Sequence, residues 1–87
     1  MSPEAFLSVR LVKTDEHSKN KSMNALKEIE EVKRATLTYG RRVTIIAEIE
    51  YKGFDQLVNT VDRISKLENV WIHDVHKKET EYQKEEG

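Results

Sequence analysis

The chain has 87 residues, 36% charged and 37% hydrophobic, and its 15 basic and 16 acidic residues leave a formal net charge of −1. This length predicts one domain with a modest core, for which association with further copies is a natural source of stability. The balanced charge does not indicate a broad basic face for nucleic acid, and a sequence without cysteine excludes disulfides, thiolate metal sites and cysteine nucleophiles.

The N-terminal third predicts a strand, a polar segment and a helix. Apolar and polar residues alternate over 5–13, AFLSVRLVK, as in a strand with one buried face. The polar segment 14–22, TDEHSKNKS, is interpreted as a loop or a frayed helix start, with Ser18 or Ser22 as the helix cap. The helix carries a thin apolar stripe made of Met23, Leu26 and Ile29.

Two strands joined by a tight turn are predicted next. Segment 32–40, VKRATLTYG, and segment 43–51, VTIIAEIEY, both alternate with the two-residue period of a strand. Gly40 between them can adopt a positive φ without steric cost, which suits a hairpin turn. Gly53 then marks the end of the second of these strands.

Residues 54–67 predict a strongly amphipathic helix, since their apolar residues recur at spacings that keep one face apolar. Asp55 in the first turn and Lys66 in the last turn both interact favourably with the helix dipole. Segment 70–76, VWIHDVH, predicts a fourth strand, and 77–87 predicts a charged tail.

The order β-α-β-β-α-β predicts an α+β, ferredoxin-like fold, in which a four-stranded antiparallel sheet carries two helices on one face. A short internal echo supports this plan, because 26–32, LKEIEEV, and 64–70, ISKLENV, each end a helix and enter a strand. We therefore predict a single ferredoxin-like domain over 1–87, with its core over about 5–76.

Helices on one face leave the other face of the sheet uncovered. The helix side is predicted to carry Leu7, Val9, Leu11, Ile45, Ala47 and Ile49. The opposite side is predicted to carry Phe6, Val12, Ile46 and, as register allows, Trp71 or Val75. This mixed face is apolar enough to favour a homodimer that packs sheet against sheet. The predicted interface residues are Phe6, Ile46 and Trp71, and a monomer with scattered apolar surface residues is the alternative.

The segments VKRATLTYG, VTIIAEIE and GFDQLVNTVDRISKLENV resemble the C-terminal effector-binding domain of the leucine-responsive regulatory protein/AsnC (Lrp/AsnC) family, also called the regulation-of-amino-acid-metabolism (RAM) domain. The resemblance covers about residues 5–76 and is most specific over 32–50. It implies a ferredoxin-like fold and dimers that pair through their sheets and assemble further. It also implies small effectors, usually amino acids, bound between dimers near the glycine-containing hairpin.

Full-length members of this family carry an N-terminal helix-turn-helix domain. No such segment is present in the sequence, which therefore resembles the stand-alone form of the RAM domain. This resemblance implies that the chain does not bind DNA directly. It leaves two kinds of partner open, further copies of the chain or full-length Lrp/AsnC regulators.

The hairpin stretch YGRRVT departs from the family pattern, which places an aromatic residue and an aspartate after the glycine. Here Arg41 and Arg42 follow Gly40, so two guanidinium groups, which suit a carboxylate or a phosphate, stand where an acid would meet an amino group. A small anionic metabolite is therefore favoured over a plain amino acid, and a solvated turn whose charges discourage edge pairing is the alternative. The predicted ligand-binding residues are Tyr39, Gly40, Arg41, Arg42 and Thr44.

His73, Asp74 and His76 are of types that bind metals. In a regular strand, Asp74 and His76 share one face and His73 takes the other, so one strand cannot supply all three ligands and no metal site is predicted. The sequence shows no spacing typical of nucleophilic catalysis, no phosphate loop and no clustered catalytic carboxylates, so neither an enzyme activity nor a cofactor is predicted.

Together these features predict a stand-alone small-molecule-sensing regulatory module that self-associates through its sheet and binds an effector between dimers. Effector binding would favour one assembly over another. One alternative is an assembly or chaperone module that binds a partner peptide, similar to the cytoplasmic assembly chaperone of periplasmic nitrate reductase. Another is a small metal- or heme-related enzyme with a dimeric ferredoxin-like fold.

A cytoplasmic location and no membrane partner are predicted from two further features. The N-terminal stretch MSPEAFLSVRLVKTDEH lacks a basic segment followed by a long apolar run, so it does not read as a signal peptide. No apolar stretch approaches the roughly 20 residues that a helix needs to cross a bilayer.

Overall fold

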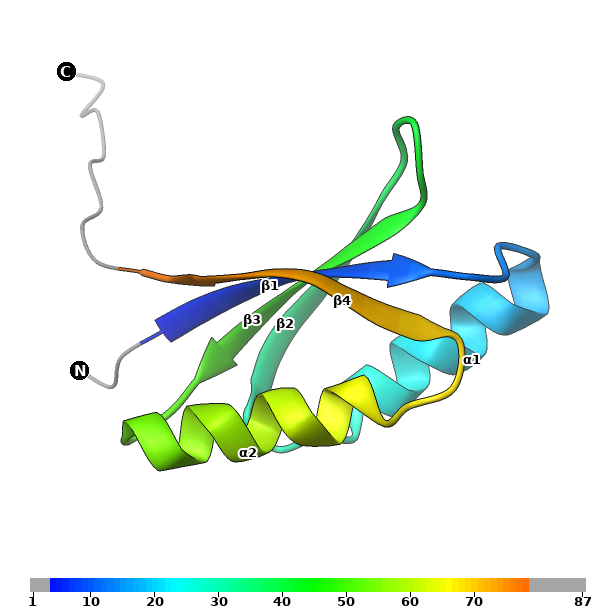
Figure 1. Cartoon of the computed structure of the whole chain (residues 1–87). Helices are drawn as coiled ribbons and strands as arrows, with labels where there is room; N and C mark the ends of the chain where they lie inside the picture. Colours follow the sequence, from blue (N-terminus) through cyan, green and yellow to red (C-terminus); the bar gives the residue numbers. More distant parts are fainter. Residues whose placement is uncertain (1–3, 79–87) are drawn as a thin grey trace, which may run out of the picture.

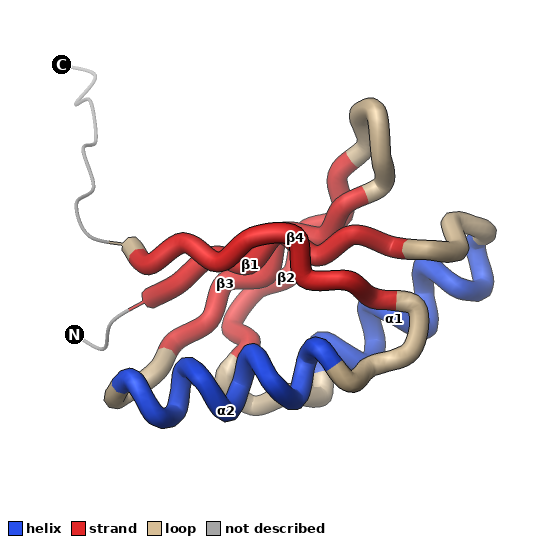
Figure 2. Tube along the Cα trace, in the orientation of Figure 1, coloured by secondary structure: helices blue, strands red, loops and turns tan. Residues whose placement is uncertain are grey.

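A computed structural model of the protein describes residues 4–78, whose elements follow the order β-α-β-β-α-β. The antiparallel sheet has the strand order β2-β3-β1-β4, and both helices lie on the same side of it (Figure 1, Figure 2). The predicted α+β, ferredoxin-like fold is confirmed. The elements are β1 (Glu4–Leu11), α1 (Glu16–Lys27), β2 (Val32–Thr38), β3 (Thr44–Glu50), α2 (Phe54–Ser65) and β4 (Val70–Lys77).

Most strand and helix ends differ from the predicted ones by one or two residues. β1 ends at Leu11 because the next residues turn toward the α2–β4 loop, where the Val12 amide donates to the Asn69 carbonyl at 3.1 Å. β4 includes Lys77, which the prediction placed in the charged tail. The remainder of that predicted tail, 79–87, lies outside the described residues.

Helix α1 begins earlier than predicted and has a different cap. Asp15 is the N-cap residue, and its carboxylate accepts hydrogen bonds from the Ser18 amide at 3.0 Å and the Ser18 hydroxyl at 2.7 Å. These bonds hold the pKa of Asp15 below its usual value. The prediction of Ser18 or Ser22 as the cap was therefore wrong, and Ser22 is instead buried and accepts from the Asn69 side chain at 3.2 Å.

The core lies between the sheet and the two helices. The side chains predicted to face the helices are all buried, and α2 adds Leu57 and Ile64 while α1 adds Leu26. Thr60 is also fully buried in α2, because its hydroxyl donates to the Gln56 carbonyl at 2.8 Å and so carries its own hydrogen bond into the core. Among residues 4–78, no helix is both long and apolar enough to span a membrane.

Cross-strand register fixes which side chains share the face of the sheet that the helices leave uncovered. Arg10 pairs with Thr44 on β3 and with Trp71 on β4, so these three lie side by side on that face. Four residues along β1, Phe6 pairs with His76. Further members of the uncovered face are Ser8, Thr36, Thr38, Ile46, Glu48 and Asp74.

Glu31 forms an ion pair beneath the sheet that makes stability depend on pH. Its carboxylate, in a side chain only 12% exposed, contacts the Arg63 guanidinium and lies 3.1 Å from the Thr60 hydroxyl, whose single hydrogen is shared between Glu31 and the Gln56 carbonyl. Arg63 and then Thr60 hold the pKa of Glu31 below its ordinary value of 4.5, against the opposing effect of burial. Because the folded-state pKa is depressed, this pair stabilises the fold above about pH 4.5, and the contribution disappears as the pH falls through the folded-state pKa.

We therefore expect Glu31→Gln to lose less unfolding free energy than the wild type between about pH 7 and about pH 3.5, since the glutamine cannot titrate. Urea denaturation at the two pH values measures the difference. Glu28→Gln, at an exposed position on the same connection, is the matched control and should follow the wild type. Equal losses in wild type and Glu31→Gln would show that the Glu31–Arg63 pair does not contribute to acid stability.

Candidate functional site

The β2–β3 hairpin rises from the sheet on the side away from the helices (Figure 1). Its last strand pair is Thr38 and Thr44, and the Thr38 hydroxyl donates to the Thr44 carbonyl at 2.9 Å. The connecting loop is 39–43. Gly40 does not adopt a positive φ there, and a side chain at this position would meet no atom, so the turn does not use the conformational freedom that made glycine suit it.

Beneath the hairpin the uncovered face of the sheet is hollowed, with a volume of about 520 Å³. The hollow contains all five predicted ligand-binding residues, so the structure brings them together. β1 and β4 contribute residues that the sequence-based prediction missed, Ser8, Arg10 and His73. The lining is Ser8, Arg10, Thr38, Tyr39, Gly40, Arg41, Arg42, Thr44 and His73.

The arginines at this hollow differ from those elsewhere in the chain. Arg34 lies 3.5 Å from the Glu48 carboxylate, and Arg63 is paired with Glu31. Arg10, Arg41 and Arg42 form no ion pair with any residue of 4–78, and the hollow has no aspartate or glutamate in its lining. The same three arginines also line a smaller hollow of about 380 Å³ beside Thr14.

Three guanidinium groups around one hollow repel one another when no anion is present. Each guanidinium offers several N–H donors in a planar fork that matches a carboxylate or phosphate. The hydroxyl of Thr44 and the ring of His73 add further polar groups at the same place. The hollow therefore concentrates donors that suit an anion, and of the two interpretations left open by the sequence, a ligand site or a solvated turn, its charge distribution favours the first.

Tyr39 connects the loop of the hairpin to helix α1. Its hydroxyl accepts a hydrogen bond at 2.9 Å from the Lys19 ammonium, which also lies 5.0 Å from the centre of the Tyr39 ring. Lys19 is nearly buried and pairs with Glu16 at 2.8 Å. Glu16 and then Tyr39 raise the pKa of Lys19, so the ammonium stays charged and the contact with Tyr39 persists. Tyr39 thus ties the start of the loop that carries Arg41 and Arg42 to α1.

A bulge in β4 changes where His73 points. Ser8 pairs with Asp74 and its neighbour Val9 pairs with Ile72, so His73 is an extra residue that interrupts the alternation. The prediction that His73 faces away from Asp74 was wrong for this reason, because His73 lines the same hollow as Ser8. Asp74 and His76 share a face as predicted.

The arrangement of Asp74 and His76 decides whether this strand offers ligands to a metal. The Asp74 carboxylate lies 2.9 Å from the Nε2 atom of His76, so this acid is already engaged by a neighbouring side chain. No group of three or more histidine, aspartate or glutamate residues within 4–78 is arranged to hold a metal ion.

The predicted interface residues lie on the uncovered face, at different distances from the arginines. Phe6 and Ile46 are half-buried among their neighbours, whereas Trp71 is 69% exposed beside Arg10. Two other predicted members of this face lie elsewhere. Val75 pairs with Leu7 and so faces the helix side, and Val12 lies beyond the end of β1.

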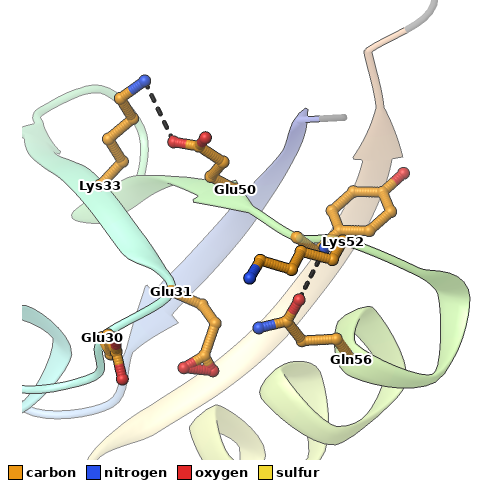
Figure 3. A pocket seen from close by; sticks show the side chains of 7 residues that line it. Glu30, Glu31, Lys33, Glu50, Lys52 and Gln56 are labelled. Atoms are coloured by element: carbon orange, nitrogen blue, oxygen red, sulfur yellow. Dashed lines mark hydrogen bonds and ion pairs between the residues drawn. The ribbon is translucent and has the colours of Figure 1, made fainter. Parts of the chain in front are cut away.

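A separate hollow, of about 310 Å³, lies at the far end of β3 (Figure 3). Its charges are matched within the protein, because Lys33 lies 3.2 Å from the Glu50 carboxylate and Glu31 is held by Arg63. Gln56 accepts from the Lys52 amide at 2.6 Å. The lining of this hollow holds three glutamates and two lysines, which nearly balance, so it gives no comparable indication of a ligand.

Comparison with known proteins supports the fold. No family model and no curated protein matches the sequence. A solved structure of a glycine-to-threonine mutant of Rv3291c is similar over 98% of this chain, with a TM-score of 0.72 and 15% sequence identity. The matched region is 55% of that protein, so this chain spans about half the length of its structural neighbour. At this level of identity the likeness establishes the fold and leaves function to the site.

Proposed function

We propose that this protein is a small-molecule-sensing regulatory module of the Lrp/AsnC type, which self-associates through the uncovered face of its sheet and binds an anionic effector at the β2–β3 hairpin. The observation that carries the proposal is the hollow lined by Arg10, Arg41 and Arg42 without any acidic partner. The sequence resemblance to the RAM domain, with its effector site near this hairpin, supports the regulatory role.

The charge of the hollow sets the class of effector. A carboxylate or phosphate can accept several charge-assisted hydrogen bonds from the arginines. The ammonium of a plain amino acid would lie among three cations with no lining carboxylate to meet it. The effector is therefore an anionic metabolite, and the protein senses it through binding rather than by converting it.

Self-association provides the response to the effector. The hollow opens on the same face of the sheet that carries Phe6 and Ile46, so a second copy packed on this face lies close to the bound anion. An anion that neutralises the arginines removes the cost of bringing their charges near a partner. Effector binding and assembly are then linked, and each strengthens the other.

Titration calorimetry with pyrophosphate, citrate and leucine tests the effector class. We expect the two polyanions to bind and leucine to bind weakly or not at all. Light scattering of the same samples should show larger assemblies when a polyanion is present. Leucine binding as tightly as citrate would replace the anionic effector with an amino acid, and binding of none of the three would remove the sensing function.

Without added ligand, we expect light scattering at about 10 μM protein to give at least the mass of a dimer rather than the 10.2 kDa of one chain, because Phe6 and Ile46 leave an apolar patch on the uncovered face. Ile46→Lys places a charge in this patch and should shift the protein to the monomer. Val58→Lys, at an exposed position on α2, is the matched control and should remain associated. A monomeric wild type would contradict the sheet-face interface.

A further inference from the structure

The exposed ring of Trp71 lies beside the arginine hollow. An anionic effector that binds only to the arginines gives this ring no role. Trp71 pairs with Arg10 across β1 and β4, and paired side chains on one face have Cβ atoms about 5 Å apart. Phe6 lies four residues from Arg10 along β1, which corresponds to about 13 Å. Trp71 is therefore a neighbour of the arginines rather than of the apolar patch around Phe6.

The ring of Trp71 is also free to receive a flat group. It is 69% exposed, although burial is the usual environment of so large an apolar surface. The cation–ring contacts within the described part of the chain are Lys19 on Tyr39 and Lys77 on Phe54, so Arg10 does not cover the indole. An indole with an open face beside guanidinium groups fits a ligand that carries an aromatic ring and an anion together.

The charge and size of the hollow narrow this class further. Three guanidinium groups exceed what one carboxylate needs, and they match the greater charge and the larger number of acceptor oxygens of a phosphate or diphosphate. A volume of about 520 Å³ lies in the range of sites for whole small molecules. The hydroxyls of Ser8 and Thr44 suit the sugar that joins a phosphate to a base.

Resting on the proposed function, we propose that the effector is a nucleoside phosphate. Its phosphates bind Arg10, Arg41 and Arg42, and its base stacks on the indole of Trp71. This assigns Trp71 to the ligand, while Phe6 and Ile46 form the contact between copies.

Trp71 is the single tryptophan of the chain, so its fluorescence reports directly on a stacked base. Titration of the whole protein with ADP should quench this fluorescence, and pyrophosphate should not. Calorimetry should show ADP binding about 10- to 100-fold more tightly than pyrophosphate or ribose 5-phosphate, which is the gain expected from one stacked base.

Substitution of the ring separates its role from that of the phosphates. Trp71→Leu should reduce ADP affinity to that of pyrophosphate and leave pyrophosphate affinity unchanged. Phe54→Leu, at an exposed aromatic residue of α2 outside the hollow and the uncovered face, is the matched control and should keep wild-type ADP affinity. Light scattering should show that Trp71→Leu still self-associates, and loss of the dimer in this variant would return Trp71 to the subunit contact and overturn the assignment.

The other outcomes distinguish this inference from the proposed function. Equal affinities for ADP and pyrophosphate, with unchanged fluorescence, would overturn the nucleoside part and leave an anion-sensing module. Binding of neither ADP nor pyrophosphate nor citrate would overturn both.

Discussion

Replacing Ile64 with alanine should lower the free energy of unfolding by about 2–5 kcal/mol. Ile64 is fully buried on α2 and packs in the core between this helix and the sheet. The substitution removes buried methyl groups and leaves a cavity that the surrounding β-sheet, held by its ladder of hydrogen bonds, can only partly close. A loss of this size is a large part of the total stability of roughly 5–15 kcal/mol that a small domain has.

Urea denaturation followed by circular dichroism measures this loss. Val58→Ala is the matched control, because Val58 lies on the same helix but is 48% exposed, and it should change the unfolding free energy by no more than about 0.5 kcal/mol. Val61 also belongs to the predicted apolar stripe, yet it is only partly buried and should give an intermediate loss. Similar losses at Ile64 and Val58 would show that the buried face of α2 has been wrongly assigned.

The core could be predicted from the sequence because burial leaves a periodic pattern. Every second residue from Leu7 to Leu11 and from Ile45 to Ile49 is apolar, and these are the side chains that the helices cover. The two-residue period identified these segments as strands, and the spacing of apolar residues over 54–67 identified that segment as a helix. Element order then left the ferredoxin-like plan as the simplest way to bury both helices on one sheet.

The bulges at Lys33 and His73 could not be predicted in this way. A bulge adds one residue to one strand of a pair, and neither position differs in residue type from its neighbours enough to mark it. The consequence is large for the site, because every residue of β4 beyond His73 changes face relative to a regular strand. This is why Val75 lies on the helix side and His73 at the hollow.

The candidate site could be predicted in part. Tyr39 to Thr44 are consecutive, so a local reading of the hairpin was sufficient to group them. Arg10 comes from a strand far away in the sequence, and its position beside Thr44 follows only from the pairing of β1 with β3. The alternation of polar and apolar residues in β1 placed Arg10 on the uncovered face. The order of the strands in the sheet, which brings Arg10 beside Thr44, could not be predicted from this pattern.

The double variant Arg41→Ala with Arg42→Ala should abolish polyanion binding. Each charge-assisted hydrogen bond lost costs about 1.5–3 kcal/mol, or roughly 10- to 150-fold in affinity, so two lost guanidinium groups should weaken pyrophosphate binding by about 100- to 20,000-fold. Both arginines are exposed and form no ion pair within residues 4–78, so the melting temperature of the unliganded protein should hardly change.

Calorimetry with pyrophosphate measures the loss of binding, and Arg34→Ala is the matched control. Arg34 lies on the same hairpin, but it is paired with Glu48 outside the hollow, so its removal should leave affinity within about twofold. A general effect of net charge would weaken both variants and would fade with added salt, whereas a specific site separates them. If the double variant binds pyrophosphate as well as the wild type, the arginines are solvated surface charges and the hairpin is a turn without a ligand.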